Sequence, residues 1–198
     1  MILPIYAYGQ PVLRQKAKEI TSDFRGLDKL IEDMWETMYH ANGVGLAAPQ
    51  VGRPIRLFMV DTLQLNNDDD DDETENEEEA TAEKEPRIKQ AFINAQKIEE
   101  TGEEWSYEEG CLSIPDITGE VDRPETITLK YMDEQFQEHT KTFTGMNARV
   151  IQHEYDHIDG VLFVEYLKPV KKQLIRRKLE AIRKGKAKAK YHMKFLQK

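Results

Sequence analysis

Two histidines with three residues between them, in the segment His153-Glu154-Tyr155-Asp156-His157, set the first condition on the fold. A helix places residues i and i+4 on one face, so both imidazoles reach one metal ion if this segment is helical. Glu154 then lies beside that ion, where it can take a proton from water. The alternatives are two surface or core histidines next to a solvated acid, and a closed structural metal site. Structural zinc draws four protein ligands, and a chain with one cysteine offers few sulfur donors, which favours an open catalytic site.

Apolar residues at spacings of three and four predict three helices. The first covers residues 27–40 and ends at Asn42-Gly43, since both residues tolerate a positive φ. The second covers residues 145–159 and carries the two histidines on one stripe. The third begins near Pro169 and is interrupted by Gly185, and the order of the residues beyond stays open. Its expected apolar side consists of Val170, Leu174, Ile175, Leu179 and Ile182.

The segments between these helices have the patterns of strands. Residues 55–60 and 91–95 are candidates on either side of an acidic block, and residues 127–131 can pair with a strand returning within 134–143. Glycine, proline and aspartate punctuate these segments, so we expect short strands in an antiparallel sheet. The 198 residues contain no internal repeat and no glycine-rich phosphate loop. We therefore predict one α+β domain over residues 1–198, with an antiparallel sheet around the central histidine helix and further N-terminal and C-terminal helices.

The net charge of −9 sums two segments of opposite sign. Residues 66–86 hold 12 acidic residues against one lysine, a balance of −11, and residues 168–198 hold 13 basic residues against one glutamate, a balance of +12. The acidic block has almost no apolar residue to order it, so we expect a disordered loop insertion. A partner-binding or metal-scavenging segment is the alternative.

Composition also bears on the compartment. No apolar run approaches the roughly 20 residues that span a bilayer, and the start of the chain has no cleavable leader. A single cysteine excludes an internal disulfide framework and fits a reducing compartment. We therefore expect a cytoplasmic protein without a membrane segment.

The helix motif supplies two metal ligands, and a catalytic site needs a third with one position left for water. A lone cysteine such as Cys111 is either a ligand or an inert buried side chain, and Gly110 before it permits close approach of the backbone. The small residues 43–50 form either a tight crossing that needs glycine or an exposed edge for an extended peptide, with Gln50 as a donor to an oxyanion. Candidates for the third ligand are Cys111, His40, His139, His192 and the many acidic residues.

Taken together, three segments resemble the motifs of the peptide deformylases. That family has G-x-G-x-A-A-x-Q, E-G-C-x-S and H-E-x-D-H in this order, and the chain matches all three at residues 43–50, 109–113 and 153–157. The resemblance covers most of the chain, with residues 66–86 as an insertion. It implies removal of the formyl group from N-formylmethionine at the start of newly made proteins, with release of formate.

The resemblance also implies the metal site and its chemistry. It assigns Cys111, His153 and His157 as ligands of one divalent ion, and Glu154 as the general base and acid for a metal-bound water that attacks the formyl carbonyl. The family implies Fe(II) in vivo, with Zn(II), Ni(II) or Co(II) as possible ions in a purified protein. The softness of a Cys-His-His set alone suggests zinc.

For the substrate, the resemblance assigns Gln50 and the backbone N–H of Leu112 to the oxyanion. Its backbone partners for an extended peptide are Val44, Gly45 and Gly110. The expected walls of the methionine pocket are Val44, Met146 and Val150. Arg149 departs from an apolar lining, and we expect its stem to wall the pocket while its charge reaches solvent or the peptide.

Several interpretations of the whole chain remain to be compared. The resemblance implies that the basic C-terminal helix docks on the ribosome near the exit of nascent chains. We expect the protein to be a monomer, since one domain without a heptad pattern needs no partner. A zinc endopeptidase is a second possibility, with Glu180 as a downstream ligand. A third is an RNA-binding module that uses the basic tail and has only a structural metal.

Overall fold

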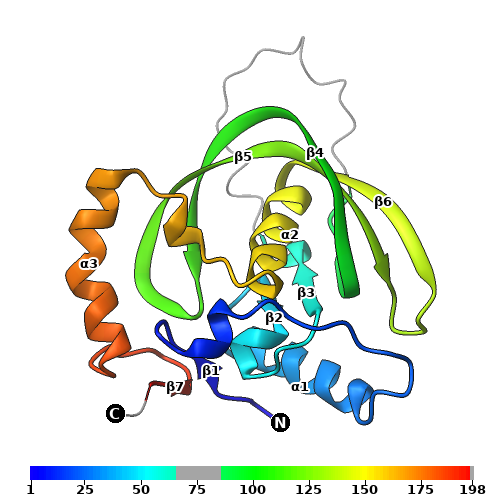
Figure 1. Cartoon of the computed structure of the whole chain (residues 1–198), viewed down its shortest axis with the longest axis horizontal. Coiled ribbons are helices and arrows are strands. Elements are labelled where there is room, and N and C mark those ends of the chain that lie inside the picture. Colours follow the sequence, from blue (N-terminus) through cyan, green and yellow to red (C-terminus); the bar gives the residue numbers. More distant parts are fainter. Residues whose placement is uncertain (66–85, 197–198) are drawn as a thin grey trace.

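Helix α2 (Gly145–Ile158) lies at the centre of the molecule, beneath an arch of long strands (Figure 1). Helix α1 (Leu27–His40) lies at the foot of the arch, and α3 (Pro169–Arg183) runs along one side. This computed structural model describes residues 1–65 and 86–196. The three helices confirm those predicted from the sequence, including the stop after α1, where Asn42 has a φ of 55°.

Five strands form one antiparallel sheet in the order β2-β3-β4-β5-β6. Their bounds are Gly45–Ala47 (β2), Leu57–Asp61 (β3), Lys89–Cys111 (β4), Ile114–Met132 (β5) and Glu138–Thr144 (β6). A second, two-stranded parallel sheet joins β1 (Ile5–Tyr6) to β7 (Met193–Lys194) near the end of the chain. The fold is the predicted α+β domain.

Strand β3 is buried on both faces because a helix packs on each. Successive side chains of a strand point to opposite faces. Phe58 and Val60 join a core cluster with Ile151 and Ile158 of α2. Leu57 and Met59 join a second cluster, with the apolar stripe of α1 at Leu27, Ile31, Met34 and Met38. This layering holds α2 against the sheet and fixes the position of its histidines.

The prediction of short strands is wrong for β4 and β5, which are 23 and 19 residues long. Residues that punctuate strands lie inside this pair: Gly102 is at a shift in register between Thr101 and Glu104, and Pro124 pairs with Glu104. A glycine with a φ of 86° suits a bulge, and bulges bend a strand without ending it. The hairpin therefore curves over α2 as the arch in Figure 1.

The apolar side of α3 is narrower than predicted. Ile175 and Ile182 are buried, whereas Val170 and Leu174 are each 72% exposed, because only the stripe through Ile175 and Ile182 faces the domain. Gly185, with a φ of 70°, follows the helix as expected, and the chain then turns back to form β7. The tail between Gly185 and residue 196 is thus part of the fold.

The acidic block lies outside the described residues except for its last residue, Pro86. Its neighbours on either side lead from β3 and into β4, which pair with each other, so the block connects two adjacent strands as predicted. Among the described residues, no helix is long and apolar enough to cross a membrane.

Candidate active site

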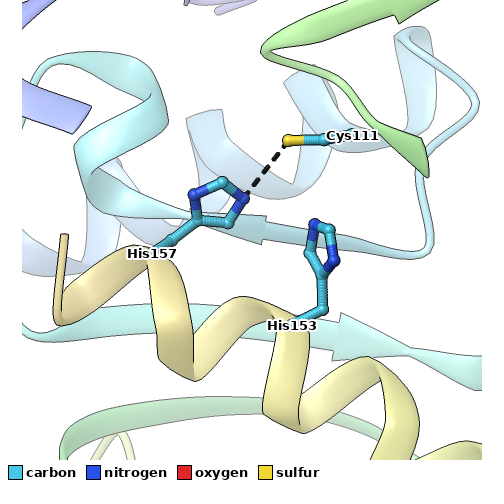
Figure 2. A group of neighbouring side chains, drawn as sticks. All are labelled: Cys111, His153 and His157. Atoms are coloured by element: carbon cyan, nitrogen blue, oxygen red, sulfur yellow. Dashed lines mark hydrogen bonds between the residues drawn. The ribbon is translucent and has the colours of Figure 1, made fainter. Parts of the chain in front are cut away.

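Three potential metal ligands meet where the end of β4 passes over α2. One potential ligand atom from each of Cys111, His153 and His157 lies within 4.8 Å of the other two, and Cys111 Sγ is 3.3 Å from His157 Nε2. Figure 2 shows both rings rising from successive turns of α2 toward the cysteine. One thiolate and two imidazoles suit a soft or borderline divalent ion, and three ligands leave a position open for water. The donor set therefore fits one catalytic metal ion.

The other candidate ligands lie elsewhere. His40 is not part of the cluster, although it lines the cavity described below. His139 pairs with Asp133 Oδ2 at 2.7 Å on the hairpin of β5 and β6. His192 lies on the exposed tail. Within residues 1–65 and 86–196, only the cysteine joins the two helix histidines in such a cluster.

A buried carboxylate, Glu109, orients His153. Glu109 Oε2 lies 2.9 Å from His153 Nδ1, so Nδ1 carries the proton and Nε2 is free to face the metal position. Arg123 donates to both carboxylate oxygens at 2.7 and 3.0 Å, and Arg149 adds a bond at 3.0 Å. Burial opposes ionisation of Glu109, but the bonds from His153 and Arg123 outweigh it and lower its pKa. The carboxylate is therefore a fixed anion behind the ligand.

Arg149 corrects one expectation about the pocket. Its side chain is 2% exposed, and its guanidinium donates to the carbonyls of Val121 and Trp105 as well as to Glu109. The guanidinium carbon also lies 4.3 Å from the centre of the Trp105 ring. The charge thus points into the protein rather than to solvent, because the buried Glu109 carboxylate needs a partner there.

Glu154 lies beside the ligand cluster and is buried in a tight space. Its side chain is 5% exposed, and Oε2 has no hydrogen-bond partner among the described residues. Burial raises its pKa from 4.5 to about 7. Gly45 of β2 makes room for it, since a Cβ there would lie 2.5 Å from Glu154 Oε1. A carboxyl with this pKa and one unpartnered oxygen is suited to accept and return a proton near neutral pH.

The amide of Gln50 has a fixed orientation. Its Oε1 accepts from the backbone N–H of Ala47 at 2.8 Å, so its NH2 group must face the cluster. Nε2 donates to Ser113 Oγ at 3.2 Å and lies 3.5 Å from Cys111 Sγ. Gln50 is 1% exposed, so this donor is held in place before a substrate arrives.

A cavity of about 720 Å³ opens onto these groups. Strand β2 lies at the edge of the sheet and borders the cavity, and the tail after α3 forms a further part of its wall. The structure brings together all the substrate-side residues assigned from the resemblance. The cavity is lined by Val44, Gly45, Gln50, Gly110, Leu112, Met146 and Val150.

The sequence analysis missed the residues behind the ligands. Glu109 is part of the E-G-C segment, so its place next to a ligand was a usable signal, but nothing in the sequence marked Arg123 as its partner. Arg123 also pairs with Asp156 Oδ2 at 2.8 Å. These groups lie 14 and 33 positions from Arg123 in sequence, and only the curvature of β5 over α2 brings them together.

A helix bearing two histidines and a glutamate, with a strand-borne cysteine opposite, defines a hydrolase site with room for one metal ion. The model of the polypeptide deformylase family matches residues 2–173. The peptide deformylase of Christiangramia forsetii is 52% identical over 197 residues, covering 98% of this chain and 96% of that relative. That of Flavobacterium psychrophilum is 53% identical, covering 100% of this chain and 99% of the relative. The crystal structure of the peptide deformylase from Thermus thermophilus superposes with a TM-score of 0.77 at 37% identity, covering 93% of this chain and 99% of that one. The chain belongs to the peptide deformylase family and is a hydrolase.

Proposed function

We propose that this protein removes the formyl group from N-formylmethionyl peptides with the help of one divalent metal ion held by Cys111, His153 and His157. The observation that carries the proposal is that Cys111, His153, the buried Glu154 and the fixed Gln50 donor line one cavity, with His157 directly behind the first two. The cavity runs along the edge strand β2, where a peptide can lie in extended form.

The metal ion, when bound, would supply Lewis-acid chemistry that polarises the formyl carbonyl and makes water acidic. Glu154 takes the proton from the attacking water and delivers it to the leaving amine nitrogen. Its raised pKa, due to burial, suits both transfers near neutral pH. The Gln50 NH2 and the Leu112 N–H stabilise the negative charge on the formyl oxygen. The carbon–nitrogen bond breaks, and formate and a free amino terminus result.

The substrate backbone pairs with the open side of β2. The Val44 carbonyl already accepts from the Asp61 N–H of β3 at 2.8 Å. Because backbone groups alternate along a strand, those of Gly45 point away from β3 and toward the cavity. We therefore place main-chain contacts at Gly45 and Gly110, and assign Val44, Met146 and Val150 to the wall around the methionine side chain.

The decisive experiment is formate release from a formyl-Met-Ala-Ser peptide by protein purified without oxygen. The wild type should release formate and contain about one metal ion per chain, whereas Glu154→Ala should keep the metal and lose turnover. Metal analysis of the same samples tests our expectation of Fe(II). A fully metallated wild type that releases no formate would refute the proposal.

The same proposal covers partners and location. The basic residues of α3 and the tail give a cationic surface for ribosomal RNA, and a ribosome-bound cytoplasmic monomer would meet nascent chains early. Pelleting with ribosomes should weaken as salt rises, and Lys171→Glu combined with Lys178→Glu should weaken it further. Equal pelleting of the double variant and the wild type would contradict this part.

Glu180 contacts Arg183 and Lys184 on α3 and lies outside the ligand cluster, which removes the support for an endopeptidase.

A further inference from the structure

The tail after α3 reaches back to the active site. Gly185 N–H donates to the Ile182 carbonyl as the helix ends, and the chain then runs to β7, which pairs with β1. Backbone bonds of 2.9 Å from Ile5 N–H to the His192 carbonyl and 3.0 Å from Ala7 N–H to the Lys194 carbonyl secure it. Between these anchors, residues 188–191 line the same cavity as Cys111 and Glu154. The tail is therefore fixed at both ends where it passes the site.

Within this tail, Tyr191 makes a direct bond to the segment that follows the cysteine ligand. Its hydroxyl donates to the Leu112 carbonyl at 2.7 Å. Leu112 and Ser113 form the two-residue turn between β4 and β5, in which Cys111 pairs with Ile114. Tyr191 is partly buried, and this burial raises the pKa of its hydroxyl. The phenol thus stays a neutral donor.

The turn is held from two more directions. The Tyr8 N–H donates to the Ser113 carbonyl at 2.8 Å, and Gln50 Nε2 donates to the Ser113 hydroxyl at 3.2 Å. Both bonds act on Ser113, and among the described residues the bond from Tyr191 is the one side-chain contact that holds the Leu112 carbonyl. The Leu112 carbonyl lies in the peptide plane after the Leu112 Cα and the Leu112 N–H in the plane before it. Holding the carbonyl therefore restrains the turn from one side of this Cα, and the restraint acts on the N–H and on the Cys111 side chain through the Leu112 backbone.

We propose that Tyr191 is a positioning residue, which holds the turn at Leu112 and Ser113 so that the Cys111 thiolate and the Leu112 N–H keep their places in the reaction. The inference rests on the proposed function. It makes the C-terminal tail a part of the active site, so that a residue distant in sequence controls the metal ligand and the oxyanion donor together.

The test compares Tyr191→Phe with wild type and with Tyr6→Phe. The Tyr6 hydroxyl accepts from Lys194 Nζ at 3.0 Å, so its loss also removes one tail contact but leaves the Leu112 carbonyl untouched. Loss of one neutral hydrogen bond predicts that kcat of Tyr191→Phe falls about 3- to 10-fold, with KM unchanged and Tyr6→Phe like wild type. In the Co(II)-loaded proteins, the thiolate-to-cobalt absorption should shift in Tyr191→Phe alone.

Three outcomes would overturn the inference. These are an unchanged kcat and cobalt spectrum in Tyr191→Phe, an equal loss in both variants, and a loss confined to KM. An equal loss in both variants would show that the tail acts only through stability, which the thermal midpoints of the three proteins would confirm. A loss confined to KM would show that the tail acts only as a wall of the cavity. Failure of the proposed function itself is distinguishable, because the wild type would then release no formate.

Discussion

Glu154→Gln should stabilise the metal-free protein, and it should abolish the activity of the metal-loaded protein. Glu154 is 5% exposed and has one oxygen without a partner in the described part of the chain. Burial raises its pKa from 4.5 to about 7, so the folded state holds a proton that the unfolded state has already lost. Raising the pH from 4.5 through 7 therefore favours unfolding of the wild type. A glutamine of the same shape does not titrate and escapes this penalty.

The size of the effect follows from the two pKa values. Each pH unit between them is worth about 1.4 kcal/mol. The span from 4.5 to about 7 therefore costs the wild type about 3 kcal/mol at pH 8.5 and close to nothing at pH 4.5. The advantage of Glu154→Gln over the wild type should grow by this amount across the same range.

Urea denaturation of both proteins at the two pH values, after removal of metal by a chelator, measures this difference. Groups that do not interact with Glu154 titrate equally in the two proteins, so the comparison leaves the contribution of Glu154 together with the groups coupled to it, His153 first. Glu103→Gln makes the same substitution at an exposed position and serves as the matched control. A stability gain in Glu154→Gln that is the same at both pH values, or a variant less stable than the wild type at pH 8.5, would refute the reasoning.

Three further predictions concern the groups around Glu154. In Gly45→Ala, the new Cβ would start 2.5 Å from Glu154 Oε1, so the carboxyl must move by about 1 Å, and a displacement of that size costs about 100-fold in kcat. Steady-state formate release with metal content in parallel checks this, and a loss below threefold would contradict it. Glu109→Gln removes the carboxylate that pairs with both Arg123 and Arg149, and Arg123 keeps Asp156 while the buried Arg149 loses its ion pair, which should cost about 3 kcal/mol in urea unfolding. A cost under 1 kcal/mol would show that the pair is not needed. Cys111→Ser replaces a thiolate by a neutral hydroxyl, so metal per chain should fall to a trace after dialysis, and retention of a full equivalent would show that Cys111 is not a ligand.

Local periodicity was sufficient to predict the helices and to place two histidines on one face of α2. The histidines of α2 lie four positions apart on one helix, and the stripe of α1 repeats every three or four residues, so the sequence around each residue determines its direction. The residue types alone left Cys111 among several candidates for the third ligand, and the resemblance to the peptide deformylases assigned it. These parts of the site needed no knowledge of distant contacts.

The parts that failed depend on contacts between distant segments. Glycine and proline in β4 and β5 lie in bulges and bends, and only the whole curved hairpin distinguishes these from strand ends. Arg149 belongs by spacing to the pocket stripe, but a carboxylate 40 positions away draws its guanidinium inward. Tyr191 is in a basic tail without any pattern, and its role comes from β7 returning to β1.

Where β4 crosses α2, two side chains of the strand contact the two histidines of the helix. Glu109 meets His153 at 2.9 Å, and Cys111 meets His157 at 3.3 Å. Two residues of a strand advance about 6.6 Å, and four residues of a helix about 6 Å, so the two contacts are separated by nearly the same distance along β4 and along α2. Deleting Gly110 would leave Glu109 beside His153 but turn Cys111 to the other face of β4, away from His157, because each residue beyond the deletion moves by one position. The spacing from Glu109 to Cys111 on β4 therefore matches the spacing from His153 to His157 on α2, and neither can change alone.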